Sequence, residues 1–285
     1  MPSRLHTLLT LGRVSNLPTA WSNCLAAWIL AGGGKGSQLG LVLASGSCLY
    51  IGGMVLNDAC DVEFDRRHRQ QRPIPSGLIS PRAVWCWAIG ILLAGLLLAI
   101  PLGGRALACA LALLATIVAY DLWHKRQPFS IGLVALCRFL LYLLASFAAA
   151  GTISLRLLTA TLGLAAYVLG ISLLARHESG VSRPPKWPMA VLLIPALTAW
   201  LPAFDSALGA ILFACFLFAG WLGISLLPLW GPDQQTGRVV SRLLAGMVLV
   251  DWLQVSAVAP SWTVAALFAI LFGTAVGLQK RFQAT

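Results

Sequence analysis

Four carboxylates lie within one short stretch of a chain that is poor in acids. The sequence has nine Asp and Glu among 285 residues, and Asp58, Asp61, Glu63 and Asp65 are four of them. On a helix, residues three and four apart share a face, so Asp58, Asp61 and Asp65 converge while Glu63 points away. Like charges at these spacings repel each other, and burial raises their cost. A cation is therefore expected at this face.

Mg²⁺ is the natural candidate for that cation. It takes hard oxygen ligands from one or two carboxylates and completes its shell with water and substrate phosphates. The amide carbonyl of Asn57, next to the acids, can add a further oxygen. The alternative is a solvated helix end whose acids pair with Arg66, Arg67 and Arg69.

Basic residues in three other segments favour the metal site. Arg72 begins the string RPIPSG, where two prolines and a glycine predict a stiff loop that can hold this arginine over the acids. Lys125 and Arg126 end a later apolar segment, and Arg176 ends another. Carboxylates for a metal and several cationic donors at one level form the set needed to bind a diphosphate and stabilise it as a leaving group.

The composition indicates the elements that position these residues. The chain is 59% hydrophobic and 10% charged, with a mean hydropathy of +0.84, whereas soluble domains have roughly 25% charged residues. Apolar stretches long enough to cross about 30 Å of hydrocarbon recur almost to the C-terminus. Nine or ten helices are expected, with 187–202 and 239–258 as the two that could be broken or interfacial. The predicted helices are 14–33, 38–63, 83–101, 104–121, 129–150, 155–178, 187–202, 205–228, 239–258 and 261–280.

The distribution of positive charge predicts the orientation. Connections after the second, fourth, sixth and eighth helices are rich in Lys and Arg, whereas the other connections hold Lys35, Arg105 and Arg156. Short basic loops stay in the cytoplasm, so the acid cluster is expected at the cytoplasmic side of the inner (plasma) membrane. The net charge of +11 is then mainly a topology signal, and nucleic acid is not an expected partner.

Two motifs carry a family resemblance. Residues 57–65 match NDxxDxxxD, and with residues 72–77 they resemble the UbiA superfamily of intramembrane prenyltransferases. Segments 13–19 and 120–126 and the helix count are also similar to that family. The resemblance implies one all-α domain over 1–285, a polytopic transmembrane bundle of about nine helices around a central cavity. It also implies Mg²⁺-dependent transfer of an isoprenyl group from its diphosphate to an acceptor, often aromatic.

The resemblance also assigns roles. Arg72 and Lys125 would contact phosphate directly, with Arg126 and Arg176 as further substrate-binding cations, and Asp121 would take the acceptor's proton. Ionisation would leave an allylic carbocation that the cavity protects from water. The metal ligands would be Asn57, Asp58, Asp61 and Asp65, and the three aspartates with Asp121 would form the catalytic set.

One motif departs from the family pattern. A second acid-rich motif of the DxxxD kind is expected at the end of the sixth helix, but residues 175–180 keep only Glu178. Either Glu178, with His177, supports a second metal, or one Mg²⁺ serves with Arg176 replacing the other charge, or the chemistry has drifted. We favour retained activity with a modified site. The RPIPSG string resembles chlorophyll synthases, and the reduced motif resembles the EboC-like bacterial branch, so the acceptor stays open.

Two charged residues lie inside apolar runs. Arg138 is expected to bind substrate from within the cavity, although snorkelling or a salt bridge is an equal alternative. Asp251 is expected to pair with Arg242 or to be solvated. His124, a lone histidine near a loop, is expected to be solvated as well.

Three other functions are compatible with parts of the pattern. A transporter would use Arg138, Asp251 and the acids as a polar path, but the acids cluster at one surface. CDP-alcohol phosphotransferases also bind Mg²⁺ in a membrane bundle, but their DGxxAR element is absent from the sequence. A homologue that binds prenyl diphosphate or lipid without catalysis would explain the reduced second motif.

Overall fold

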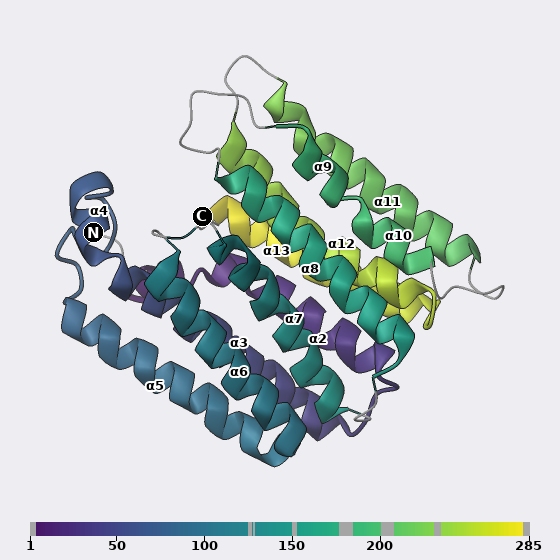
Figure 1. Cartoon of the computed structure of the whole chain (residues 1–285), viewed down its shortest axis with the longest axis horizontal. Coiled ribbons are helices and arrows are strands. Elements are labelled where there is room, and N and C mark those ends of the chain that lie inside the picture. The colour runs from purple at the N-terminus through teal and green to yellow at the C-terminus, as the bar shows by residue number, and fades with distance from the viewer. Residues whose placement is uncertain are drawn as a thin grey trace.

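The regular elements of the computed structural model are all helical (Figure 1). The structure describes residues 4–124, 127, 129–149, 153–176, 185–200, 208–230 and 235–281, with the side chains of 4–6 left out. The α-helices are α1 (Arg4–Leu11), α2 (Leu17–Leu30), α3 (Gly36–Cys60), α4 (Val62–His68), α5 (Pro81–Ala99), α6 (Gly104–Trp123), α7 (Ser130–Ala148), α8 (Leu155–Ala175), α9 (Trp187–Val191), α10 (Ile194–Trp200), α11 (Leu208–Leu226), α12 (Thr236–Ser256) and α13 (Trp262–Arg281). Three 3₁₀ turns are η1 (Val14–Asn16), η2 (Ile100–Leu102) and η3 (Leu227–Leu229).

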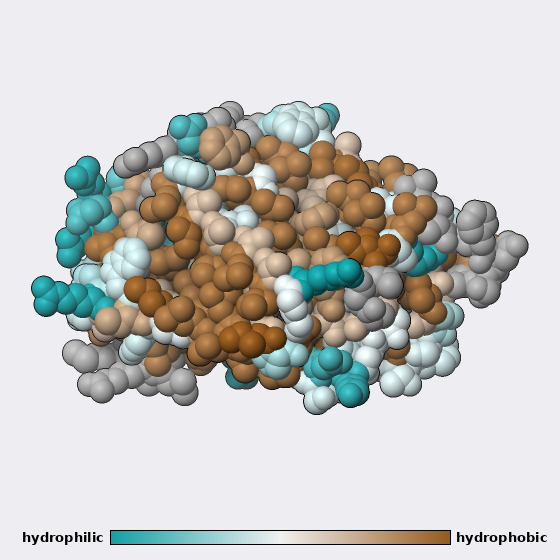
Figure 2. Space-filling view, turned by 60° about the horizontal axis from the view of Figure 1, so that its bottom comes forward, coloured by the Kyte–Doolittle hydropathy of each residue, from teal (hydrophilic) through white to brown (hydrophobic). Residues whose placement is uncertain are grey.

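The long helices run side by side as a bundle, which confirms the predicted all-α fold (Figure 1). Within the described ranges, eight helices are long and apolar enough to cross a membrane. Hydrophobic side chains cover the middle of the face in Figure 2, and hydrophilic side chains lie mainly at its margins. This distribution fits a protein whose outer surface contacts lipid.

The two uncertain segments differ from each other in the structure. The segment 187–202 is broken into α9 and α10, because Pro195 near the start of α10 has no N–H to continue the helix from α9. In contrast, α12 is unbroken and lies in the centre of the bundle, packed against α2, α8, α11 and α13. The expectation that one of the two segments is broken is therefore confirmed at α9 and α10, whereas 239–258 belongs to an intact helix.

A buried polar network holds three of the central helices together. Asp251 of α12 is fully buried. Its Oδ2 accepts hydrogen bonds from Ser22 Oγ at 2.5 Å and Asn23 Nδ2 at 2.7 Å, both on α2, and its Oδ1 accepts one from Tyr142 Oη of α7 at 2.8 Å. The predicted pairing of Asp251 with Arg242, or its solvation, is wrong: the Arg242 guanidinium donates to the backbone carbonyl of Ile224. A carboxylate in the core needs donors from neighbouring helices, and α2 and α7 supply them.

Glycines allow α3 and α5 to approach closely. A Cβ built on Gly95 of α5 would lie 2.9 Å from Leu49 Cγ of α3, and one on Gly52 would lie 2.7 Å from Leu92 Cγ of α5. Side chains larger than hydrogen do not fit without movement at either position. This contact places α3, whose C-terminal end carries Asn57 and Asp58 and leads into Asp61, against α5.

Gly95→Ala should therefore destabilise the protein by about 1–3 kcal/mol through overpacking. Gly90→Ala is the matched control, because it lies on the same helix and a Cβ there meets nothing within 4 Å. Both changes gain the same helix propensity, so their difference isolates the packing effect. Thermal unfolding of the two purified variants in detergent measures it, and equal midpoints would contradict the assigned packing.

Candidate active site

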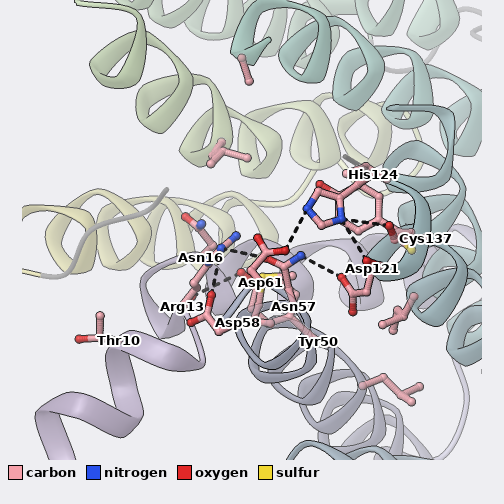
Figure 3. Close-up of a pocket in the computed structure, with 18 of the residues that line it drawn as sticks. Thr10, Arg13, Asn16, Tyr50, Asn57, Asp58, Asp61, Asp121, His124 and Cys137 are labelled. Carbon is pink, nitrogen blue, oxygen red and sulfur yellow. Dashed lines mark hydrogen bonds and ion pairs between the residues drawn. The ribbon is translucent and has the colours of Figure 1, made fainter. Parts of the chain in front are cut away.

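A cavity of about 810 Å³ opens among α3, α6, α7 and the N-terminal segment. Figure 3 shows polar side chains gathered at one end of it, and they come from segments far apart in the sequence. The deeper lining is apolar and includes Leu49, Leu113, Ile117 and Leu141. The polar lining includes Arg13, Asn16, Tyr50, Asn57, Asp58, Asp61, Arg69, Arg72, Asp121, His124 and Arg138.

The three predicted acids are all buried. Asp58, Asp61 and Asp65 have exposed fractions of 7%, 8% and 2%. Asp61 joins α3 to α4, yet its N–H donates to Asn57 O at 3.0 Å and the Asp65 N–H donates to Asp61 O at 2.9 Å, so helical geometry continues through the junction. Glu63 points away as predicted, with a side chain that is 76% exposed and paired to Arg66.

Arginines, rather than solvent, neutralise the acids. Arg72 Nη1 lies 2.9 Å from Asp65 Oδ2 and 3.2 Å from Asp58 Oδ1. Arg13 Nη2 lies 3.6 Å from the same oxygen of Asp58 and donates to Asn57 Oδ1 at 3.3 Å. The alternative of a solvated helix end is therefore wrong, because the buried carboxylates need partners that reach into the cavity.

The loop after α4 holds Arg72 as the two prolines predicted. The Ser76 N–H donates to Arg72 O and the Leu78 N–H to Pro73 O, so the loop folds back on itself. Gly77 has a φ of 78°, which only glycine adopts readily. Arg13, in contrast, is a non-glycine residue at a φ of 43°, a costly conformation at the point where its side chain enters the site.

The C-terminal end of α6 lies opposite the acid cluster of α3 and α4 and contacts it through Asp121 and His124. Asn57 Nδ2 donates to Asp121 Oδ1 at 2.9 Å, and His124 Nε2 lies 3.4 Å from Asp61 Oδ1. The other ring nitrogen of His124 lies 3.2 Å from Tyr120 O, which orients the ring. The prediction that His124 is solvated is wrong. Because α6 ends at the same level as α3, the ring reaches Asp61 instead of solvent.

The residues present fit a magnesium ion that is held by few protein ligands. Among the described residues, no three His, Cys, Asp or Glu side chains come together as a metal group. However, the buried Asp65 Oδ1 and Asp121 Oδ2 have no hydrogen-bond partner within the described part of the chain, so two carboxyl oxygens remain unsatisfied there. Mg²⁺ needs only one or two carboxylates when water and phosphates complete its shell. Asp58 and Asp61 line the cavity, where such an ion could reach them, whereas Asp65 is not among its lining residues.

Three predicted site residues, Lys125, Arg126 and Glu178, lie outside the described residues. Arg176 does reach this end of the bundle, where its Nη2 donates to Gln127 O at 3.5 Å and its neighbour Ala175 lines the cavity.

Arg138 lies deeper in the cavity wall. Within the described residues it forms no salt bridge, and it points to α2 rather than to the interface: its Nη1 donates to Asn23 Oδ1 at 2.7 Å and its Nη2 to Thr19 Oγ1 at 3.1 Å. Its Cζ lies 5.5 Å from the centre of the Tyr50 ring.

Two participants were missed from sequence. Segment 13–19 carries a family resemblance but no role for Arg13, and a lone histidine such as His124 is expected to be solvated. The available signal for His124 was its position at the end of a helix that ends on the same side as the acid cluster.

Arg72→Ala should lower the free energy of unfolding by about 3 kcal/mol or more, because it leaves Asp58 and Asp65 buried without their shared partner. Arg66→Ala is the control, since Arg66 pairs with exposed Glu63 and such pairs contribute at most about 1 kcal/mol. Thermal unfolding in detergent compares them, and equal losses would show that Arg72 is not a buried partner.

Comparisons with known proteins agree with this geometry. The sequence profile of the UbiA prenyltransferase family matches residues 16–245. Digeranylgeranylglyceryl phosphate synthase of Methanothrix thermoacetophila is 36% identical over 124 residues, 43% of this chain and 46% of that protein. The 4-hydroxybenzoate octaprenyltransferase of Paracidovorax citrulli is 34% identical over 126 residues, 42% of this chain and 43% of that protein. The chain therefore aligns with less than half the length of these curated relatives.

Solved structures share the fold. A structure described as digeranylgeranylglyceryl phosphate synthase in membranes has a TM-score of 0.64 at 20% identity and covers 89% of this chain and 98% of that one. A UbiA homologue from Archaeoglobus fulgidus bound to GPP and Mg²⁺ has a TM-score of 0.58 at 15% identity, covering 96% and 99%. Because the profile match spans most of the chain and includes the acid cluster and nearly the whole cavity lining, the chain belongs to the UbiA prenyltransferase family.

Proposed function

We propose that the protein transfers an isoprenyl group from its diphosphate to an acceptor within the membrane, with Mg²⁺. The observation that carries the proposal is the buried cluster of Asp58, Asp61 and Asp65 with Arg13 and Arg72 at the polar end of a deep apolar cavity. An isoprenyl diphosphate has the complementary form, with a highly charged head and an apolar tail. Family membership and the names of the relatives support this assignment.

The acids would bind the diphosphate through Mg²⁺, and the basic side chains would bind it directly. Mg²⁺ would supply positive charge that balances the phosphate oxygens. Arg72 donates to phosphate directly, together with Lys125, Arg126 and Arg176. The residues that would hold the ion are Asn57, Asp58, Asp61 and Asp65, with Glu178 as the remnant of a second motif.

The reaction then follows from the surroundings of the substrate. The bond between C1 and the diphosphate oxygen breaks, and its electrons leave with the diphosphate, whose growing charge Arg72 stabilises. The apolar side chains of Leu113 and Ile117 exclude water from the allylic cation. The acceptor nucleophile bonds to C1, and its proton passes to Asp121, whose Oδ2 has no hydrogen-bond partner among the described residues.

The chain is an integral membrane protein, as its family and the eight long apolar helices among its described residues indicate. We assign it a single domain over 1–285 in the inner membrane, with the acid cluster at the cytoplasmic face, because the basic loops favour that orientation. Its partners would be an isoprenyl diphosphate, an acceptor and membrane lipids. The resemblances to chlorophyll synthases and to the EboC-like branch stay predictions.

A second candidate is a homologue that binds prenyl diphosphate or lipid without turnover. The reduced second motif, which keeps only Glu178, favours it. The transport alternative loses support, because Asp251 is fully buried and held by three donors rather than lying along a path.

Turnover distinguishes the enzyme from the binding protein. Purified protein is incubated with isoprenyl diphosphates of several lengths, Mg²⁺ and candidate acceptors, and diphosphate release is measured. Asp61→Ala, or removal of Mg²⁺ with a chelator, should lower the rate by about 100-fold or more, since several kcal/mol of charge stabilisation are lost. Glu63→Ala is the matched control, because Glu63 is an exposed carboxylate two residues away.

Wild-type rates in Asp61→Ala and in chelator would refute the site assignment. Tight binding of the diphosphate without release in any acceptor series would instead favour the non-catalytic homologue.

Asp121→Asn separates proton transfer from binding. The amide keeps a hydrogen-bond acceptor for Asn57 but cannot take a proton at neutral pH. Transfer should fall by about 10²–10⁴-fold, the usual contribution of a general base. Equilibrium binding of labelled geranyl diphosphate with Mg²⁺ should stay within about twofold of wild type. A parallel loss of binding would assign Asp121 to substrate binding instead.

A further inference from the structure

A second hollow, a groove of about 250 Å³, lies between α3, α5 and α6. Figure 1 places α5 at the edge of the bundle, beside α3 and α6. Four of the residues that line the groove, Trp85, Ile89, Leu93 and Leu122, are exposed at the surface of the protein. The groove therefore opens on the outside of the bundle, where the membrane lies.

The lining of the groove suits hydrocarbon. Apart from Asp121, the residues that form it are hydrophobic. Asp121 is itself buried, and its Oδ1 accepts a hydrogen bond from Asn57 of α3. Asp121 also lines the central cavity, so it belongs to the wall between the cavity and the groove. A ligand in the groove is thus on the other side of this wall from the acid cluster.

The groove has the length and width of a flexible chain. It extends along α5 from Trp85 to Leu93, eight residues or about 12 Å. Its volume spread over that length gives a cross-section of only about 20 Å². A transmembrane helix is about 10 Å in diameter and cannot enter such a groove. A single acyl chain can.

The position of the groove along α5 matches the depth of a lipid. Trp85 lies near the start of α5, which begins at Pro81, and tryptophan is enriched where headgroups meet hydrocarbon. Leu122, one residue before the end of α6, lines the groove as well. The groove therefore begins at the headgroup level, at the end of the bundle that holds the acid cluster, and continues into the hydrocarbon region.

A cationic side chain lies at the mouth of the groove. Arg82 precedes Trp85 by three residues and so shares its face of α5. It is exposed and makes no hydrogen bond or ion pair with any other described residue. The N-terminus of α5 adds partial positive charge at the same place. A guanidinium at the headgroup level attracts the phosphate of an anionic lipid.

We propose that the groove binds one acyl chain of an anionic phospholipid whose phosphate is held by Arg82. The apolar lining selects the chain, and the arginine one turn above it selects the charge of the headgroup. The lipid thereby covers the outer side of the wall that contains Asp121 and supports the contact between α3 and α6. An isoprenyl diphosphate does not fit this description, because its diphosphate would be separated from the acid cluster by that wall.

Native mass spectrometry of the full-length protein in detergent tests the inference. The protein is titrated with phosphatidylglycerol and with phosphatidylcholine of the same two oleoyl chains, and the affinity for the first bound lipid is measured. Phosphatidylglycerol should bind wild type about fivefold or more tightly, because its net charge is negative. Glycerol phosphate, which has the headgroup phosphate but no chain, should not bind.

Two variants with matched controls separate the headgroup from the chain. Arg82→Gln should abolish the preference for phosphatidylglycerol, whereas Arg238→Gln should keep it, since Arg238 is also exposed near the start of a helix but does not line the groove. Ile89→Trp should fill the groove and weaken the first binding event of both lipids about 10-fold. Ile270→Trp, at an equally exposed isoleucine of α13 outside the groove, should leave both affinities within about twofold.

Equal affinities of the two lipids in wild type would overturn the inference. So would a preference that survives Arg82→Gln, or tight binding that survives Ile89→Trp. Farnesyl diphosphate is the competitor for the remaining case: if it displaces the bound lipid, the groove belongs to the isoprenyl tail instead. A protein dimer that Ile89→Trp dissociates would likewise assign the groove to a second copy of the chain.

Discussion

The compensation of buried negative charge is the constraint on which the site depends. Asp58, Asp61 and Asp65 are almost fully buried at the end of a membrane bundle, where unpaired carboxylates would cost several kcal/mol each. Their partners come from three separate segments: Arg13 before α2, Arg72 after α4 and His124 at the end of α6. Each segment must therefore be placed correctly for the acids to have their partners, so the fold and the site stabilise each other.

Buried charges also occur deeper in the bundle, at Asp251 and Arg138, but there neutral side chains serve as their partners. Asp251 is satisfied by three neutral donors rather than by an arginine, and Arg138 is satisfied by neutral acceptors. Asn23 joins the two, because its amide donates on one side and accepts on the other. Opposite charges are thus separated by one side chain, which leaves the cation facing the cavity instead of neutralised within the core.

Much of the fold could be predicted from sequence, because length and apolar composition determine membrane helices almost alone. The ends of α3, α6 and α8 follow from such local rules to within three residues: they were predicted at 63, 121 and 178 and lie at 60, 123 and 175. The face shared by Asp58, Asp61 and Asp65 follows from the same rules. The central position of α12 could not be predicted in this way. Arg242 and Asp251 lower the hydropathy of this helix, and only their partners on other helices show why they are tolerated there. His124 and Arg13 could not be assigned for the same reason: their roles depend on contacts across the bundle.

Helix α3 shows how one element serves packing and both polar levels. Gly52 meets α5 and fixes the position of the helix. One and a half turns later, Asn57 faces α6 and donates to Asp121, while Tyr50 lies under Arg138 of α7. A rigid α-helix holds these levels at a constant separation, since rise and rotation per residue are fixed. The separation of Asn57 and Asp58 from Tyr50, and hence from Arg138, is therefore fixed by α3, and close packing at Gly52 and Gly95 keeps this helix from shifting.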